Sequence, residues 1–162
     1  MPGRSRPRNR TGTGFFLIKT LIVDDNANFR RSLSDMLRLR FPSMVVAHAE
    51  TIAEALQEIE TIRPGLVFVD IKLRDENGLD LTRKIRKSYP DTYVAVITSS
   101  NFPEYRQAAF DSGAQHFIPK GDSSSLAEIL ELIESLQSGR PPQWTLGANP
   151  KNIPEPRNPW KK

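Results

Sequence analysis

The feature that most constrains the fold is a regular alternation of short apolar runs, rich in β-branched residues, with longer segments of helical spacing. Parallel strands joined by helices are covered on both faces of their sheet, so each strand is expected to be a nearly continuous apolar run. The runs predict strands at Ile18–Val23, Met44–Ala47, Leu66–Val69, Tyr93–Ile97 and His116–Ile118. The sequence therefore predicts an α/β fold: a doubly wound, five-stranded parallel sheet with helices on both faces.

Helix start signals lie between these runs. Thr51 and Glu54 have the spacing of a capping box, and Ser125 and Glu128 have the same spacing at the start of the last predicted helix. The inward stripe of that last helix is predicted to leave out Leu132, which would then be an exposed contact residue. The stripe is expected to consist of Leu126, Ile129, Leu130, Ile133 and Leu136.

Composition narrows the kinds of site that the chain can build. The 162 residues include no Cys and only two His, which excludes disulfide scaffolds, zinc-thiolate and iron–sulfur sites, and a metal site made of imidazoles alone. No apolar run approaches the roughly 20 residues that a membrane-spanning helix needs. We therefore expect a soluble protein that contacts no membrane and is located in the cytoplasm.

The two ends of the chain differ from its middle in charge and texture. Residues 1–14 carry four Arg and no acidic residue, and residues 139–162 combine five basic residues with six of the thirteen Pro. Residues 15–138 are net acidic, because 18 of the 19 acidic residues and only 14 of the 23 basic residues lie there. We predict a disordered basic leader, one domain over 15–138, and a disordered Pro-rich basic tail. The tail cannot hold a helix-turn-helix, so no nucleic-acid-binding domain is expected.

Polar residues follow four of the five predicted strands. Asp24 and Asp25 come after the first strand, Asp70 after the third, Thr98 within the end of the fourth, and Lys120 after the fifth. Ligands of open α/β sheets bind outside the carboxyl ends of the strands, so we expect these side chains to meet at one edge. Taken singly, each Asp is also a common turn residue or helix N-cap.

The charges of this predicted cluster call for a counterion. Two carboxylates 4 Å apart repel by roughly 4 kcal/mol at an effective dielectric constant of about 20. A hard divalent cation, Mg²⁺ or Mn²⁺, with Asp24 and Asp25 as ligands would remove this repulsion. A carboxylate beside such an ion, a Lys and a hydroxyl is the arrangement of a nucleophile that attacks a phosphoryl group, and Asp70 is the candidate nucleophile.

The chain resembles the receiver domain of two-component response regulators over residues 17–138. The resemblance rests on the Asp24-Asp25 pair, the stretch from Asp70 to Gly78, Thr98 at its strand end, and the stretch from Gly113 to Lys120. It implies the flavodoxin-like strand order 2-1-3-4-5. Three positions are notable against the usual pattern. Arg74 stands where a Pro is common, and Gly121 follows the Lys in place of Pro. Lys72 lies two residues after Asp70, where the side chain is expected to influence dephosphorylation.

The resemblance also implies a role for each site residue. Asp70 would be the phosphoacceptor and a metal ligand, together with Asp24, Asp25 and the main-chain carbonyl of Lys72. The roles of three further residues follow from the same resemblance. Lys120 would pair with the phosphoryl group, Thr98 would move to hydrogen-bond it, and Phe117 would be the aromatic switch residue.

Three functional hypotheses follow. The first is a single-domain switch that is not an enzyme. It takes its phosphoryl group from a sensor histidine kinase or a histidine phosphotransfer protein and presents the face of its fourth helix, fifth strand and fifth helix to a protein target or to a second copy. The second is a phosphorylation-independent interaction module on the same fold. The third is a phosphatase of the haloacid dehalogenase type, which needs a general acid where this chain has Lys72.

Overall fold

The computed structural model describes residues 18–121 and 123–139. The predicted leader, residues 1–14, and all but the first residue of the predicted tail lie outside the described residues. Within the described part, the elements alternate between strand and helix as the apolar runs predict.

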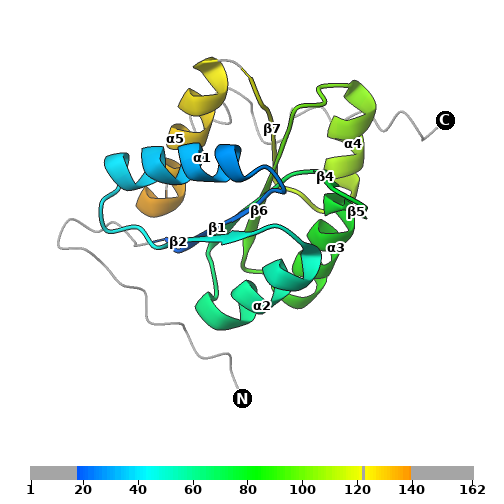
Figure 1. The fold of residues 1–162 in the computed structure, drawn as a ribbon, viewed down its shortest axis with the longest axis horizontal. Coiled ribbons are helices and arrows are strands. Elements are labelled where there is room, and N and C mark those ends of the chain that lie inside the picture. Colours follow the sequence, from blue (N-terminus) through cyan, green and yellow to red (C-terminus); the bar gives the residue numbers. More distant parts are fainter. Residues whose placement is uncertain (1–17, 122, 140–162) are drawn as a thin grey trace.

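The core of the fold is one parallel sheet with the strand order β2-β1-β3-β6-β7 (Figure 1). In chain order, these are the first to fifth strands of the main sheet arranged 2-1-3-4-5, so the predicted fold class and flavodoxin-like order are confirmed. The strands are β1 (Thr20–Val23), β2 (Val46–Ala49), β3 (Leu66–Val69), β6 (Tyr93–Thr98) and β7 (His116–Pro119).

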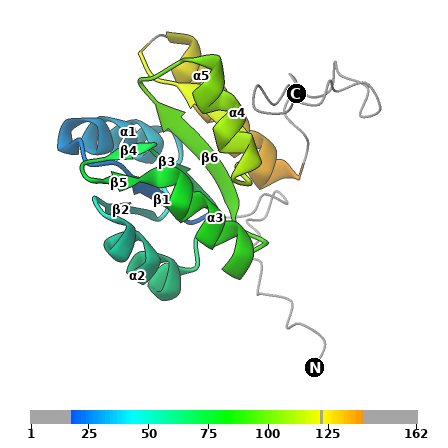
Figure 2. The ribbon, with the colours of Figure 1, turned by 90° about the vertical axis from the view of Figure 1, so that its right-hand side faces the viewer.

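Helices cover both faces of the sheet (Figures 1 and 2). They are α1 (Ala27–Arg40), α2 (Ile52–Ile62), α3 (Gly78–Ser88), α4 (Pro103–Asp111) and α5 (Ser123–Ser138). Neighbouring residues of a strand point to opposite faces. Accordingly, Ile22 and Phe68 pack with α1 and α5, whereas Leu21 and Val67 pack with α2 and α3. None of the helices in the described ranges has both the length and the apolar character that crossing a bilayer requires.

Four of the five strands differ from the prediction at a boundary; β6 and β7 each extend one residue further, to Thr98 and Pro119. The first strand begins at Thr20 rather than Ile18, and the second spans Val46–Ala49 rather than Met44–Ala47. Met44 is a buried apolar residue that lies before the strand. Its N–H donates to the Phe41 carbonyl (2.9 Å) in the turn after α1. The structure also contains a hairpin that was not predicted, formed by two strands of two residues each, β4 (Lys72–Leu73) and β5 (Glu76–Asn77).

The predicted inward stripe of the last helix is confirmed at Ile129 and Ile133, which are buried, but it is wrong at two leucines. Leu132 is fully buried, whereas Leu126 is 48% exposed. The helix begins at Ser123, two residues before the predicted start, and the Ser125 hydroxyl donates to the Pro119 carbonyl. Apolar residues lie on more than one side of this helix. The side that faces the core is the one that carries Ser125 and Leu132. The periodicity alone could not choose between these stripes.

Gly78, at the start of α3, gives a test of this packing. A Cβ at Gly78 would lie 1.9 Å from the Asp70 carbonyl oxygen, a contact that only a backbone shift can relieve. We predict that Gly78→Ala lowers the free energy of unfolding by about 3 kcal/mol or more, measured by urea denaturation. Gly65→Ala is the control, because its Cβ would meet only the Ile18 Cγ2 atom, at 3.3 Å. Equal midpoints for the two variants would contradict the prediction.

Candidate functional site

The pairing of β1 with β3 brings two acidic residues side by side. Val23 and Val69 are partners in the parallel register, and the Asp70 N–H donates to the Val23 carbonyl (2.9 Å). Asp24 and Asp70 directly follow these paired residues of β1 and β3, so they lie at the same edge of the sheet. Both are buried, with 1% and 7% of their surface exposed.

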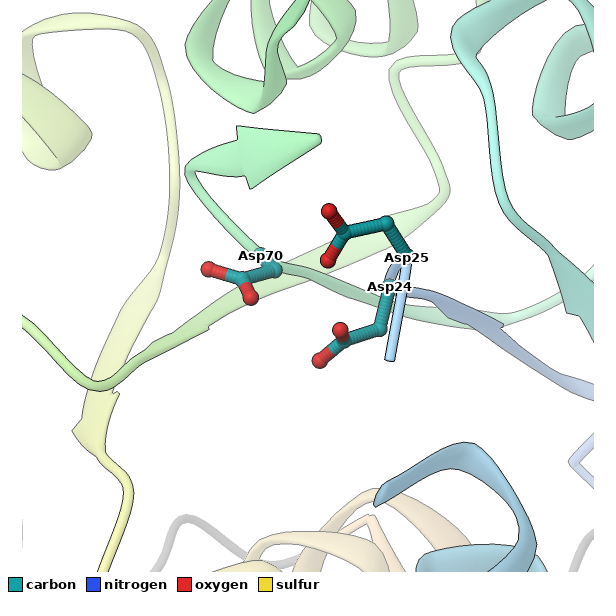
Figure 3. A group of neighbouring side chains, drawn as sticks. All are labelled: Asp24, Asp25 and Asp70. Atoms are coloured by element: carbon teal, nitrogen blue, oxygen red, sulfur yellow. The ribbon is translucent and has the colours of Figure 1, made fainter. Parts of the chain in front are cut away.

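Asp25 completes a cluster of three carboxylates (Figure 3). One carboxylate oxygen from each of Asp24, Asp25 and Asp70 lies within 4.8 Å of the other two. Asp25 is half-buried, and its Oδ2 atom accepts a hydrogen bond from the Arg74 N–H (3.1 Å). The three residues that the sequence predicts as acidic ligands are therefore neighbours at the carboxyl edge of the sheet.

Lys120 reaches this cluster from the end of β7. The Lys120 N–H donates to the Thr98 carbonyl (2.8 Å), which places the residue at the same sheet edge. Its Nζ atom donates to Asp24 Oδ2 (2.6 Å) and to Asp70 Oδ2 (2.9 Å). Gly121 follows with φ +110°, a conformation that glycine adopts without strain, so the turn forms without the usual Pro.

Burial and pairing act against each other in this cluster. Burial raises the pKa of Asp24 above its ordinary value, although hydrogen bonds from Lys120 and from the Asn26 N–H lower it in part. Burial alone would lower the pKa of Lys120, but its hydrogen bonds to Asp24 and Asp70 outweigh that effect and raise it. Lys120 is thus held as a cation, yet it does not fully offset the cost of burying Asp24 as a charged group.

The donor set fits a hard divalent cation. Three carboxylates face one ammonium group, so with all of them ionised the cluster keeps two negative charges that the described side chains in contact with it do not neutralise. Carboxylate oxygens are the ligands that Mg²⁺ and Mn²⁺ prefer. Asp24, Asp25 and Asp70 are the residues that would hold the ion.

Thr98 and Phe117 lie on the neighbouring strands β6 and β7. Thr98 ends β6, is buried, and is paired in register with Pro119. Phe117 lies on β7 opposite Val96 and packs in a small buried cluster with residues of α3 and α4. The Arg106 guanidinium covers the Phe117 ring at 5.6 Å. The two predicted switch residues are therefore on adjacent strands, one beside Lys120 and the other beneath α4.

Lys72 lies in the loop that follows Asp70. Its N–H donates to Asp70 Oδ1 (3.3 Å), and its side chain is exposed. The Asp70 carboxylate thus has the Lys72 N–H on one oxygen and the Lys120 ammonium on the other. The role of the Lys72 main-chain carbonyl as a ligand stays a prediction.

The sequence reasoning missed the residues that hold the cluster from outside. Arg30 donates to the Asp24 carbonyl (2.5 Å) and to Glu50 Oε1 (2.7 Å), and Arg74 lies 3.6 Å from Glu50 Oε2. Arg30 follows the α1 N-cap, Asn26, by four residues, so its position in the first turns of α1 could have indicated that it faces the strand end. Arg74 was noted only as a departure from the usual Pro, and Glu50 gave no comparable signal.

The chain was compared with known protein families, and residues 20–134 match the response regulator receiver domain. The chain belongs to this family. Curated relatives include the response regulator GacA of Pseudomonas syringae pv. syringae, 30% identical over 124 residues, which are 76% of this chain and 57% of that protein. The chain spans about half the length of the curated relatives it matches.

Solved receiver structures share the fold. A CheY-like receiver domain protein from Methanospirillum hungatei is 29% identical, with a TM-score of 0.65 over 76% of this chain and 98% of that one. A LuxR-family response regulator from an Aurantimonas species is 26% identical, with a TM-score of 0.68 over 76% of this chain and 87% of that one. As a family, receiver domains work with histidine kinases.

Arg74 gives this receiver domain a loop that proline could not form. Its φ is +55°, whereas proline is restricted to about −65°, and its N–H is the donor to Asp25. The departure from the usual Pro is thus matched by a hydrogen bond that helps to orient a predicted metal ligand.

We predict that Arg74→Pro weakens Mg²⁺ binding about tenfold, because it removes the donor to Asp25 and forces the loop out of its conformation. Calorimetric titration with Mg²⁺ measures this. Arg74→Gly is the matched control, since glycine keeps both the N–H and the positive φ, and it should bind Mg²⁺ nearly as the natural chain does. Equal affinities for the Pro and Gly variants would show that the hydrogen bond is unimportant.

Proposed function

We propose that this domain is a phosphoacceptor switch in which Asp70 takes a phosphoryl group from a histidine kinase or a histidine phosphotransfer protein. The observation that carries the proposal is the environment of the Asp70 carboxylate. It is buried beside two further carboxylates, and Lys120 donates to one of its oxygens at 2.9 Å. A buried carboxylate fixed in this way can present one oxygen to an incoming phosphorus atom with little reorganisation.

In the proposed reaction, an Asp70 oxygen attacks the phosphorus atom of a phosphohistidine. The O–P bond forms while the P–N bond breaks, and the leaving imidazole nitrogen keeps the electron pair and takes a proton from solvent. Lys120 would move its donated hydrogen bond from Asp70 to a phosphoryl oxygen. A bound Mg²⁺ would offset the negative charge of the carboxylates and of the phosphoryl group. Attack by water on the same phosphorus atom breaks its bond to the Asp70 oxygen, releases inorganic phosphate and restores the Asp70 carboxylate.

The proposed output begins at Thr98. A phosphoryl group on Asp70 would attract the Thr98 hydroxyl, which in the described structure accepts a hydrogen bond from the Ser100 N–H (3.3 Å). Movement of Thr98 changes the packing next to Phe117 on the adjacent strand, and Phe117 supports α4. The face of α4, β7 and α5 would then bind a protein target or a second copy of the chain in one state and not in the other.

The proposed switch is not an enzyme that acts on other molecules. It catalyses uptake and loss of its own phosphoryl group and turns over no other substrate. The proposed location is the cytoplasm, which suits a chain without cysteine. Lys120 is in contact with both Asp24 and Asp70, the side chains that this chemistry needs, which favours it over the phosphorylation-independent module.

The test is phosphorylation by a small donor. We predict that phosphoramidate or acetyl phosphate with Mg²⁺ adds one phosphoryl group to the chain, seen by intact mass spectrometry, and that the adduct is stable in acid and labile in base. Asp70→Asn should abolish the adduct. Asp75→Asn is the matched control, because Asp75 is an exposed Asp of the same loop, and it should be labelled normally.

Two outcomes would contradict the proposal. Labelling of Asp70→Asn at the natural rate would place the phosphoryl group elsewhere. Steady hydrolysis of an unrelated phosphate ester such as p-nitrophenyl phosphate would instead favour a phosphatase.

A further inference from the structure

The Lys120 ammonium has a third neighbour besides its two carboxylates. Its Nζ atom lies 4.1 Å from the centre of the Phe29 ring, which comes from the first turn of α1. This distance is well inside the range of about 6 Å in which an ammonium group is attracted to an aromatic face. The Lys120 side chain is 15% exposed, so the attraction acts in a site that is largely shielded from water.

The backbone of Phe29 is linked through Asn26 to the same carboxylate that binds the lysine. Asp24 Oδ1 accepts from the Asn26 N–H (2.8 Å), and the Asn26 side chain, as the N-cap of α1, accepts from the Phe29 N–H (3.1 Å). Asp24 Oδ2 accepts from Lys120 Nζ (2.6 Å). The contacts therefore form a closed circuit of four residues: Asp24, Asn26, Phe29 and Lys120. Within this circuit the start of α1 holds an aromatic face against the ammonium group.

This contact constrains the lysine where the carboxylates alone do not. Asp24 and Asp70 accept from the ammonium group, but a flexible lysine side chain could keep either bond while its Nζ atom moves. A ring packed against the same group restricts that movement and excludes water from it. Phe29 itself is half-buried and packs against the hydrophobic core of α1 and α5, so its ring is held by contacts other than Lys120.

We propose that Phe29 is a positioning residue for Lys120: its aromatic face holds the ammonium group at Asp70, where it is needed to receive the transferred phosphoryl group. This inference rests on the proposed function for its consequence in phosphorylation, but the contact itself is independent of it. A purely structural Phe29 would need only apolar volume, whereas a positioning Phe29 needs an aromatic ring.

The experiment distinguishes the effect of the Phe29 aromatic ring from the effect of its apolar volume. Phe29→Leu keeps apolar bulk without the ring, and Phe29→Tyr keeps the ring. Met36→Leu is the control, because Met36 packs against the same core but lies seven residues, about 10 Å, further along α1. Two quantities are measured for each variant: the NMR shifts of the Lys120 ε-methylene in the unphosphorylated chain, and the rate of labelling by phosphoramidate with Mg²⁺.

We expect the natural chain, Phe29→Tyr and Met36→Leu to show an upfield ring-current shift of the Lys120 ε-methylene and similar labelling rates. Phe29→Leu should lose the shift and label about three- to tenfold more slowly. An unchanged shift in Phe29→Leu would overturn the contact. A lost shift with an unchanged labelling rate would overturn the positioning role. Failure of the natural chain to be labelled would refute the proposed function and this role with it, while the shift would still report the contact.

Discussion

The mutual repulsion of three carboxylates at one sheet edge is the constraint on which the site depends. Parallel pairing of β1 with β3 forces Asp24 and Asp70 together, and Asp25 follows directly in the chain. Burial makes this arrangement costly, as the raised pKa of Asp24 shows. Contacts nearby act to support it: Lys120 bridges two of the carboxylates, Arg74 donates to the third, and Arg30 binds the Asp24 carbonyl.

The same lysine connects the acidic cluster to the rest of the sheet. Its main-chain N–H is bonded to Thr98, and Phe117 lies three residues before it on β7, under the Arg106 guanidinium of α4. A change in what the Lys120 ammonium contacts is therefore one strand away from the support of α4. This short route, through two adjacent strands and their hydrogen bonds, would let the proposed switch act without a large rearrangement of the fold.

The fold and the acidic cluster could be predicted from sequence because they follow from a simple rule: residues that end parallel strands meet at one edge. The apolar runs located the strands to within about two residues, and their ends named Asp24, Asp70 and Lys120. The rotation of α5 could not be predicted, because Leu126 and Leu132 are equally apolar and only tertiary packing distinguishes them.

Contacts between residues far apart in the sequence could not be predicted either. The bond from Arg74 to Asp25 depends on a left-handed residue in a short hairpin, and nothing in the letters around Arg74 requires that conformation. Phe29 and Lys120 are 91 residues apart, and an aromatic residue in the first turn of an amphipathic helix is indistinguishable from an ordinary core residue. Local patterns specify which element a residue joins, but not the side chain it meets.

The central claim is that the cluster requires a divalent cation and has one site for it. Calorimetric titration of the chain with Mg²⁺, and of Asp25→Asn under the same conditions, tests this most directly. The account predicts one ion per chain and a loss of at least about tenfold in affinity in the variant, because a charged oxygen ligand is removed. No binding by the natural chain at millimolar Mg²⁺, or equal affinity in the variant, would contradict it.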